Sequence, residues 1–140
     1  SKRGIMLYFA YGSNLHQEQM KKRCSGCKYL KRYILQDYRL TFRSELCVAD
    51  IEYKKGSSVQ GALYEITEKD ESCLDKYEDF PILYKKMYFK HYKKKVMTYI
   101  MVKKTEFRYP TEKYLNVIKQ GYKDCNLDKK YLTNALKNIK

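Results

Sequence analysis

The chain has 140 residues, and its 30 Lys and Arg against 16 Asp and Glu give a formal net charge of +14. This length suits one domain with its own hydrophobic core, so we expect residues 1–140 to form a single domain. No apolar run approaches the roughly 18 residues that a membrane span requires, and no hydrophobic leader precedes the first apolar segment. Both features predict a soluble, cytoplasmic protein that has no membrane partner.

The basic charge could point to a nucleic-acid partner, but the lysines are spread along the whole chain. Basic residues occur in pairs and triplets beside apolar residues, at 21–23 (Lys-Lys-Arg), 54–55, 85–86, 93–95 and 129–130. This distribution favours a solvated surface over a dedicated binding face. We therefore expect no specific nucleic-acid partner.

In chain order, the first predicted elements are a buried strand at 7–11, a Gly-containing break at 12–14 and a helix at 16–23. Segments rich in β-branched and aromatic residues then predict further strands. These segments are 29–35, 38–42, 47–53, 59–66, 85–92 and 96–102.

Three helices are predicted among and after these strands. Thr67 to Asp70 has the form of a capping box and opens a helix that reaches residue 77 or 78. Pro110 and Thr111 open a second helix, and a last one follows near the C-terminus. Their apolar positions follow helical spacing, at Tyr114, Leu115, Ile118 and Tyr122 and then at Tyr131, Leu132, Ala135, Leu136 and Ile139. Strands followed by helices predict an α+β fold with a mixed or barrel-like sheet.

The first candidate site is the turn from Tyr11 to Leu15, between the first strand and the first helix. Backbone N–H groups at such a turn lack helical partners, so they can bind a carboxylate or a developing oxyanion. Spacing alone favours the ordinary alternative, in which Ser13 or Asn14 simply caps the following helix.

The second candidate is Glu78, which lies four residues after Leu74 and so shares a helical face with it. Apolar residues follow at 80–83. Burial and the negative end of the helix dipole both favour the protonated carboxyl. Glu78 could then exchange protons near neutral pH, as a general acid and base must. The alternative is a helix-end Glu that pairs with a surface lysine.

The two candidates belong to a longer pattern. The segment Tyr8-Phe9-Ala10-Tyr11-Gly12-Ser13-Asn14-Leu15 resembles the YFAYGSNL signature of the γ-glutamylcyclotransferase-like family. Further blocks resemble the family in the same order: Val48 to Ile51, Gly61 to Glu65, Leu74 to Glu78 with Tyr84 downstream, Pro110 to Gly121, and Leu127 to Tyr131. The resemblance therefore covers nearly the whole chain.

The resemblance implies a small mixed β-barrel of about six to seven strands with flanking helices. It implies that Glu78 is the catalytic carboxylate. The substrate-binding residues that it implies are Tyr11, Gly12, Ser13, Asn14, Leu15, Tyr84 and Tyr99. Asp79 stands where many relatives have Gly, a difference that leaves the carboxylate in place and bears on the rim of the pocket, and so on the choice of amine.

The chemistry that this implies needs few groups. A γ-glutamyl amide carries its own nucleophile, the α-amino group, so one carboxylate can remove its proton and later protonate the leaving amine. The products are 5-oxoproline and a free amine, and loop N–H groups would hold the oxyanion or the α-carboxylate. We expect no metal or other cofactor, a small γ-glutamyl compound as the partner, and a monomer or homodimer.

Other chemistries have weaker support. A serine hydrolase would need Ser13 as nucleophile, His16 as base and a third group that is not evident. The five cysteines are expected to be reduced, and Cys24 and Cys27 lack the further ligands of a zinc site. A non-catalytic binding module of the same fold remains an alternative, although the presence of Glu78 argues against it.

Overall fold

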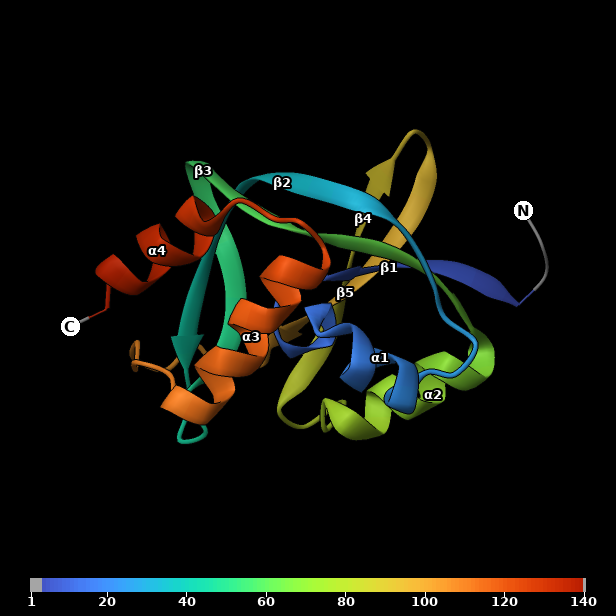
Figure 1. Ribbon diagram of the computed structural model, residues 1–140, viewed down its shortest axis with the longest axis horizontal. Coiled ribbons are helices and arrows are strands. Elements are labelled where there is room, and N and C mark those ends of the chain that lie inside the picture. Colours follow the sequence, from blue (N-terminus) through green and yellow to red (C-terminus); the bar gives the residue numbers. More distant parts are fainter. Residues whose placement is uncertain (1–3, 140) are drawn as a thin grey trace.

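The computed structural model describes residues 4–139, so the expected domain limits at residues 1 and 140 lie outside it. Its five strands form one mixed sheet in the order β2-β3-β1-β5-β4 (Figure 1). The strands are β1 (Ile5–Ala10), β2 (Lys28–Arg43), β3 (Val48–Thr67), β4 (Tyr84–His91) and β5 (Lys94–Met101). Strand β1 is central, antiparallel to β3 and parallel to β5. The α+β class is therefore confirmed, with a mixed sheet.

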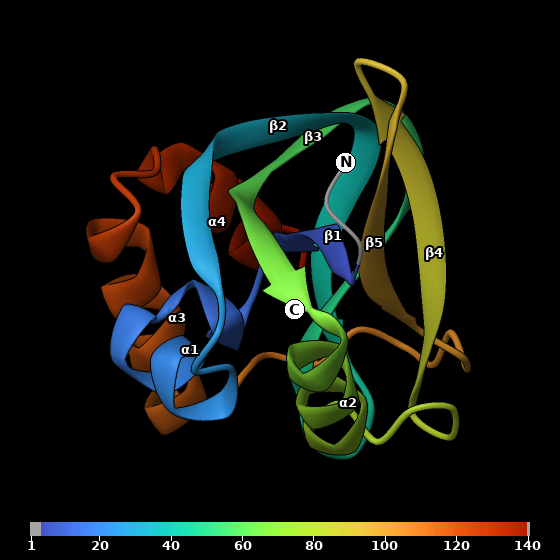
Figure 2. The same cartoon turned by 90° about the vertical axis from the view of Figure 1, so that its right-hand side faces the viewer.

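Two pairs of predicted strands are halves of single long strands. The segments 29–35 and 38–42 both belong to β2, while 47–53 and 59–66 both fall on β3. Gln36 of β2 pairs with Ser58 of β3, and Tyr38 pairs with Tyr53. The single residue Asp37 therefore lies opposite residues 54–57. Asp37 adopts a positive φ of 65° there. This bulge interrupts the hydrophobic pattern and bends both strands (Figures 1 and 2), so the sheet has fewer strands than predicted.

The predicted closed barrel is wrong. Among the described strands, the edge strand β2 pairs only with β3 and the opposite edge β4 only with β5, and the end of β2 adds an isolated bridge from Arg43 to Phe107. The bent sheet nevertheless curls until aromatic side chains of the two edges meet. The rings of Tyr33 and Phe89 stack at a centroid distance of 5.7 Å, and Tyr33 also contacts His91 edge-on at 4.9 Å. The two edge strands, β2 and β4, are therefore joined by side-chain packing and not by backbone hydrogen bonds.

The helices confirm the predictions from spacing. They are α1 (Gln17–Arg23), α2 (Glu68–Tyr77), α3 (Glu112–Asp124) and α4 (Lys129–Lys137). Helix α2 begins with the predicted capping box between Thr67 and Asp70, and Thr111 caps α3. In Figure 2, α1, α3 and α4 lie on one side of the sheet and α2 at its lower end. None of the helices within residues 4–139 has the length and apolar character needed to cross a membrane.

A short 3-10 turn, η1 (Ser13–Leu15), joins β1 to α1 and is held in place by helix α3. Gly121 of α3 allows this close contact, because a Cβ there would lie 2.5 Å from Leu15 Cβ and 2.8 Å from the His16 backbone nitrogen. The buried Leu15 side chain anchors the turn in the core. Helix α3 therefore determines where the turn after β1 lies.

Candidate functional site

The turn after β1 and the end of α2 face one small cavity of about 20 Å³. The residues that line it come from β1, η1, β3, β4, β5, α3 and the end of α2. They are Tyr8, Tyr11, Gly12, Ser13, Asn14, Ala49, Glu78, Tyr84, Tyr99 and Tyr114. The structure thus brings together every predicted site residue except Leu15, whose side chain packs into the core instead.

The turn leaves two backbone donors free in residues that line this cavity. Its first internal hydrogen bond runs from the Leu15 N–H to the Gly12 carbonyl, so the N–H groups of Ser13 and Asn14 precede it and are not used by the turn. Gly12 also lets the wall close tightly, because a Cβ there would lie 3.1 Å from Ala49 Cβ and 3.3 Å from Tyr114 Oη. A side chain at position 12 would displace the cavity wall.

Glu78 caps the C-terminus of α2, and its N–H donates to the Leu74 carbonyl. Within residues 4–139, no hydrogen bond or ion pair reaches its carboxylate, so the predicted alternative of a lysine partner is not seen. Desolvation raises the pKa of Glu78 to about 7, although the positive charge of Arg23 opposes the shift. A carboxyl group that is half protonated near neutral pH can both accept and donate a proton.

The tyrosines around Glu78 are fixed through their hydroxyl groups. Tyr11 donates to the Tyr99 carbonyl and Tyr84 to the Ala49 carbonyl, both at 2.6 Å. Tyr99 donates to Asp75 Oδ1 at 2.6 Å. Burial is the largest cause that raises the pKa of each of these three tyrosines. Their hydroxyl groups therefore stay protonated and form a neutral, rigid wall.

Three lining residues were not predicted as site residues: Tyr8, Ala49 and Tyr114. The hydroxyl of Tyr8 accepts from Asn14 Nδ2 at 2.9 Å, and that of Tyr114 accepts from the Ala49 N–H at 3.0 Å. Tyr8 lies in the same sequence block as Tyr11, which could have revealed it. Ala49 and Tyr114 also lie in segments that resemble the family, Val48 to Ile51 and Pro110 to Gly121, but only the fold of β3 and α3 brings them to the cavity.

Two further side chains stand at the rim of the cavity. Tyr77, the last residue of α2, is 44% exposed, and its hydroxyl is 2.9 Å from Ser13 Oγ. The guanidinium of Arg23 stacks on the Tyr77 ring, with Cζ 3.5 Å from the centroid. Arg23 also donates to Asn14 Oδ1 at 2.6 Å. These contacts tie Tyr77 and Arg23 to Ser13 and Asn14 of the cavity wall.

The alternative roles of the turn residues do not match the geometry. His16, rather than Ser13 or Asn14, caps α1, and its Nδ1 accepts from the Gln19 N–H at 3.2 Å. Because His16 serves as the cap and Ser13 Oγ contacts Tyr77, the nucleophile and base of a serine hydrolase are not assembled.

The segment from Cys24 to Cys27 is a turn in which the Gly26 N–H donates to Asp70 Oδ1.

Asp79 follows Glu78 but does not line the cavity. Its backbone has a positive φ of 53°, a conformation that glycine adopts without the steric cost of a Cβ. The Ile82 and Leu83 N–H groups both donate to its carbonyl at 2.9 Å. The residue that departs from the family pattern therefore shapes the chain after α2 rather than the cavity wall.

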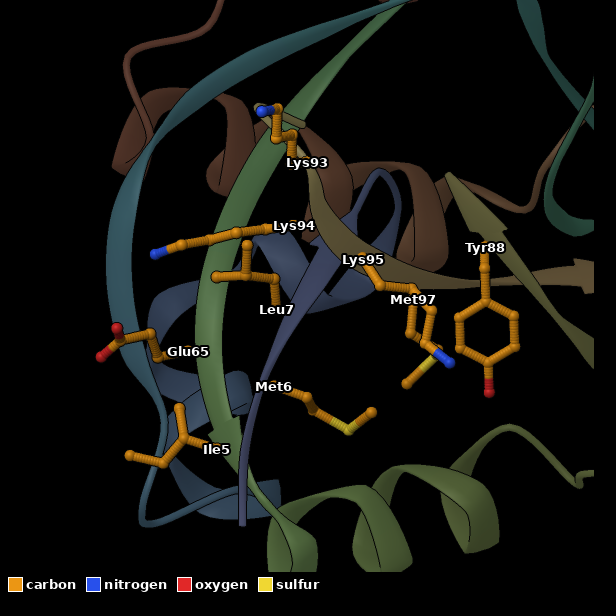
Figure 3. Close-up of a pocket in the computed structure, with 9 residues that line it drawn as sticks. All are labelled: Ile5, Met6, Leu7, Glu65, Tyr88, Lys93, Lys94, Lys95 and Met97. Carbon is orange, nitrogen blue, oxygen red and sulfur yellow. The ribbon is translucent and has the colours of Figure 1, made fainter. Parts of the chain in front are cut away.

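Larger hollows lie elsewhere on the surface. One of about 560 Å³ lies beside β1 and β5, where Met6 and Met97 contribute apolar surface and Lys93 to Lys95 contribute charge (Figure 3). It shares no residue with the cavity around Glu78, so we assign the candidate site by its chemistry rather than by its size. Among residues 4–139, no group of three His, Cys, Asp or Glu side chains lies close enough to hold a metal ion.

Comparison with known proteins places these features in a family. The family model described as "Gamma-glutamyl cyclotransferase, AIG2-like" matches residues 8–121. The uncharacterized protein loc79017 from Homo sapiens has a similar structure, with a TM-score of 0.79 and 26% sequence identity over 99% of this chain and 89% of that chain. A structure described as gamma-glutamyl cyclotransferase has a TM-score of 0.76 and 25% identity, covering 97% and 88% of the two chains.

A third solved structure, YkqA from Bacillus subtilis, shares the fold with a TM-score of 0.78 at 21% identity. It covers 98% of this chain, but this chain matches only 56% of that protein. A comparison with curated proteins finds no match.

Proposed function

The chain belongs to the gamma-glutamyl cyclotransferase, AIG2-like family, and on that premise we propose that its cavity cyclises a γ-glutamyl amide to 5-oxoproline and releases the amine. The observation that carries the proposal is the Glu78 carboxyl. Its pKa is raised to about 7, no side chain within residues 4–139 neutralises it, and it faces the same cavity as the turn at Gly12 to Asn14.

In the proposed reaction Glu78 makes two proton transfers, one before and one after a single ring closure. The ionised Glu78 carboxylate takes a proton from the substrate α-ammonium, and the free amine attacks the γ-carbonyl carbon to form a tetrahedral intermediate. The ring nitrogen of this intermediate loses its second proton to water, Glu78 returns its proton to the departing nitrogen, and the original amide C–N bond breaks. One new C–N bond forms and one breaks, so the reaction is redox-neutral and Glu78 ends as it began.

The turn would stabilise charge during these steps. The Ser13 and Asn14 N–H groups, which the turn leaves unused, can donate to the oxyanion or to the substrate α-carboxylate. The neutral tyrosine wall adds no charge that would compete with the substrate. Because the ring-closing amine and the carbonyl belong to one molecule, binding in a folded conformation provides much of the rate enhancement.

The cavity must widen before a substrate enters. A volume of about 20 Å³ accommodates roughly one water molecule, far less than a γ-glutamyl group. The exposed Tyr77 side chain is the group whose movement would widen the cavity, at the expense of its contacts with Ser13 and Arg23. The proposal therefore includes a rotation of Tyr77 when substrate binds.

The direct test is to incubate the protein with γ-glutamyl-alanine, glutathione, Nε-γ-glutamyl-lysine and γ-glutamyl-ethylamine. Mass spectrometry would follow 5-oxoproline and the released amine, which should appear in equal amounts from at least one compound. A protein with Glu78→Gln serves as the control for contaminating activity. Release of glutamate instead of 5-oxoproline would indicate hydrolysis, and no release from any compound would contradict the proposal.

A further inference from the structure

The rim of the cavity carries a positive charge that the proposed reaction does not use. Arg23, the last residue of α1, donates from Nη1 to Asn14 Oδ1 at 2.6 Å and from Nη2 to Gln19 Oε1 at 2.7 Å. Its guanidinium covers one face of the Tyr77 ring at 3.5 Å. These contacts hold the cation beside the opening, although Arg23 is not among the residues that line the cavity.

This cation lacks a carboxylate partner. The oxygen acceptors of Arg23 are both neutral side-chain amides, and within residues 4–139 no carboxylate lies within 4.0 Å of its nitrogens. Other partly buried cations do have such partners, as Arg39 pairs with Glu52 and Lys86 with Glu71. A guanidinium has five N–H donors, so three remain when two are used. Its planar fork matches a carboxylate in geometry as well as in charge.

The charge of Arg23 also extends to the reacting groups, because it lowers the pKa of Glu78 against the effect of burial. Arg23 nevertheless stands outside the cavity wall, beyond Asn14 and Tyr77. Under the proposed reaction the γ-carbonyl must lie near Glu78 and the turn. The part of the substrate that extends past the rim is then the amine that leaves.

Resting on the proposed function, we propose that Arg23 binds the carboxylate of the amino acid that leaves. The preferred substrates are then γ-glutamyl amino acids, and γ-glutamyl amines without an acid group are poorer substrates. Arg23 acts as a specificity-determining residue, and it takes no part in the proton transfers. When Tyr77 rotates to open the cavity, its contact with Arg23 is lost and the guanidinium is free to meet the incoming carboxylate.

The test uses a pair of substrates that differ by one carboxylate, γ-glutamyl-alanine and γ-glutamyl-ethylamine. Steady-state kinetics on both would be measured for the wild type, Arg23→Gln, Arg23→Lys and the control Lys22→Gln. Lys22 is exposed on the same helix, so its variant carries the same loss of charge away from the rim. We expect the wild type to prefer γ-glutamyl-alanine in kcat/KM by about 10- to 100-fold, as suits one charged hydrogen-bonded contact.

Arg23→Gln should reduce the preference for γ-glutamyl-alanine over γ-glutamyl-ethylamine in kcat/KM by a similar factor, mainly through KM for γ-glutamyl-alanine. Because Arg23 also lowers the pKa of Glu78 and contacts Asn14, the variant is judged by the ratio of the two kcat/KM values, from which a loss common to both compounds cancels. Arg23→Lys keeps the positive charge but lacks the planar, two-pronged guanidinium. Its preference for γ-glutamyl-alanine should lie between those of the wild type and Arg23→Gln. Retained turnover of γ-glutamyl-ethylamine also demonstrates that the variants are folded.

Two results would overturn the inference while leaving the proposed function intact. One is a wild-type protein that releases 5-oxoproline from both compounds with equal efficiency. The other is an Arg23→Gln variant that loses the same factor on both compounds, since Arg23 would then not contact the carboxylate that distinguishes them. By contrast, a wild type that releases 5-oxoproline from neither of these compounds, nor from the wider panel, contradicts the proposed function itself.

Discussion

At the scale of single residues, the carboxyl group of Glu78 is the feature on which the proposed reaction depends. Glu78→Gln preserves the shape of the side chain but cannot accept the α-ammonium proton. General acid and base catalysis contributes on the order of 10²–10⁴-fold, and we expect the loss in kcat to reach or exceed the top of this range with little change in binding. The measurements are 5-oxoproline release and calorimetric binding of 5-oxoproline.

The matched control for this substitution is Glu68→Gln, an exposed carboxylate in the first turn of the same helix, which should behave as the wild type. If Glu78→Gln retains more than a tenth of the wild-type kcat, Glu78 is not the acid and base.

The raised pKa of Glu78 also predicts how stability depends on pH. The folded protein holds the Glu78 proton up to a pKa of about 7, whereas the unfolded chain releases it near 4.5. Between these values the folded state binds more protons, so the contribution of Glu78 to stability falls as pH rises through this window. Glu78→Gln does not titrate, and its free energy of unfolding should exceed that of the wild type increasingly from pH 5 to pH 8.

Denaturant unfolding of both proteins at several pH values would measure this gap, which should not exceed about 3 kcal/mol. A gap that is constant over this range would mean that Glu78 titrates at its ordinary pKa.

The same pKa predicts the pH dependence of the proposed activity. As pH is lowered, kcat/KM should fall with a midpoint near pH 7, because only the ionised carboxylate accepts the substrate proton.

At the scale of elements, the packing of α3 on η1 places the turn that faces Glu78. In Gly121→Ala the new methyl group would lie 2.5 Å from Leu15 Cβ and 2.7 Å from the Leu15 carbonyl carbon. The nearest atoms include backbone, so the turn or the helix must shift. We expect a loss of about 1–3 kcal/mol in stability, despite the higher helix propensity of alanine, together with a lower kcat/KM.

Thermal unfolding and kinetics of Gly121→Ala would be compared with Lys119→Ala, an exposed substitution on the same helix. Wild-type stability and activity in Gly121→Ala would show that the turn does not depend on this close contact.

At the scale of the whole molecule, the curled sheet is held together across its open edge by aromatic side chains. Tyr33 of β2 and Phe89 of β4 stack on one another, and both also contact Phe9 edge-on at 5.8 Å. A double-mutant cycle with Tyr33→Leu and Phe89→Leu should reveal a coupling of about 0.5–1.5 kcal/mol in unfolding free energy. Additive effects would mean that the two edges do not stabilise one another.

This closure matters for the cavity because its walls come from both halves of the sheet. Strands β4 and β5 carry Tyr84 and Tyr99, while Ala49 lies on β3, and Tyr84 links the two halves by donating to the Ala49 carbonyl. The position of Ala49 is supported further by the next residue, Asp50, whose buried carboxylate pairs with Arg43 and Lys104. The geometry around Glu78 thus depends on contacts far from the turn.

Local sequence by itself determined the helices and the position of the turn, and it left Glu78 open between an acid and base and a helix-end carboxylate. Capping residues such as Thr67 and Thr111 and the apolar spacing of α3 act within a few residues, so the sequence predicted these elements well. The Tyr11 to Asn14 turn and Glu78 were candidates from their local sequence, and the resemblance to the family selected their functional interpretation over the ordinary one. The prediction that the turn and Glu78 share one cavity came from the family resemblance. The spacing of residues along the chain does not predict it.

Only the tertiary structure decided how the strands continue, where the sheet stops and what surrounds Glu78. The bulge at Asp37 interrupts the hydrophobic pattern but not the pairing of β2 with β3, because pairing depends on a partner strand that local sequence does not reveal. Tyr8, Tyr114 and Arg23 reach the site for the same reason, since their positions depend on packing between distant segments. The raised pKa of Glu78 is itself a tertiary property, because desolvation depends on every group that closes around the carboxyl.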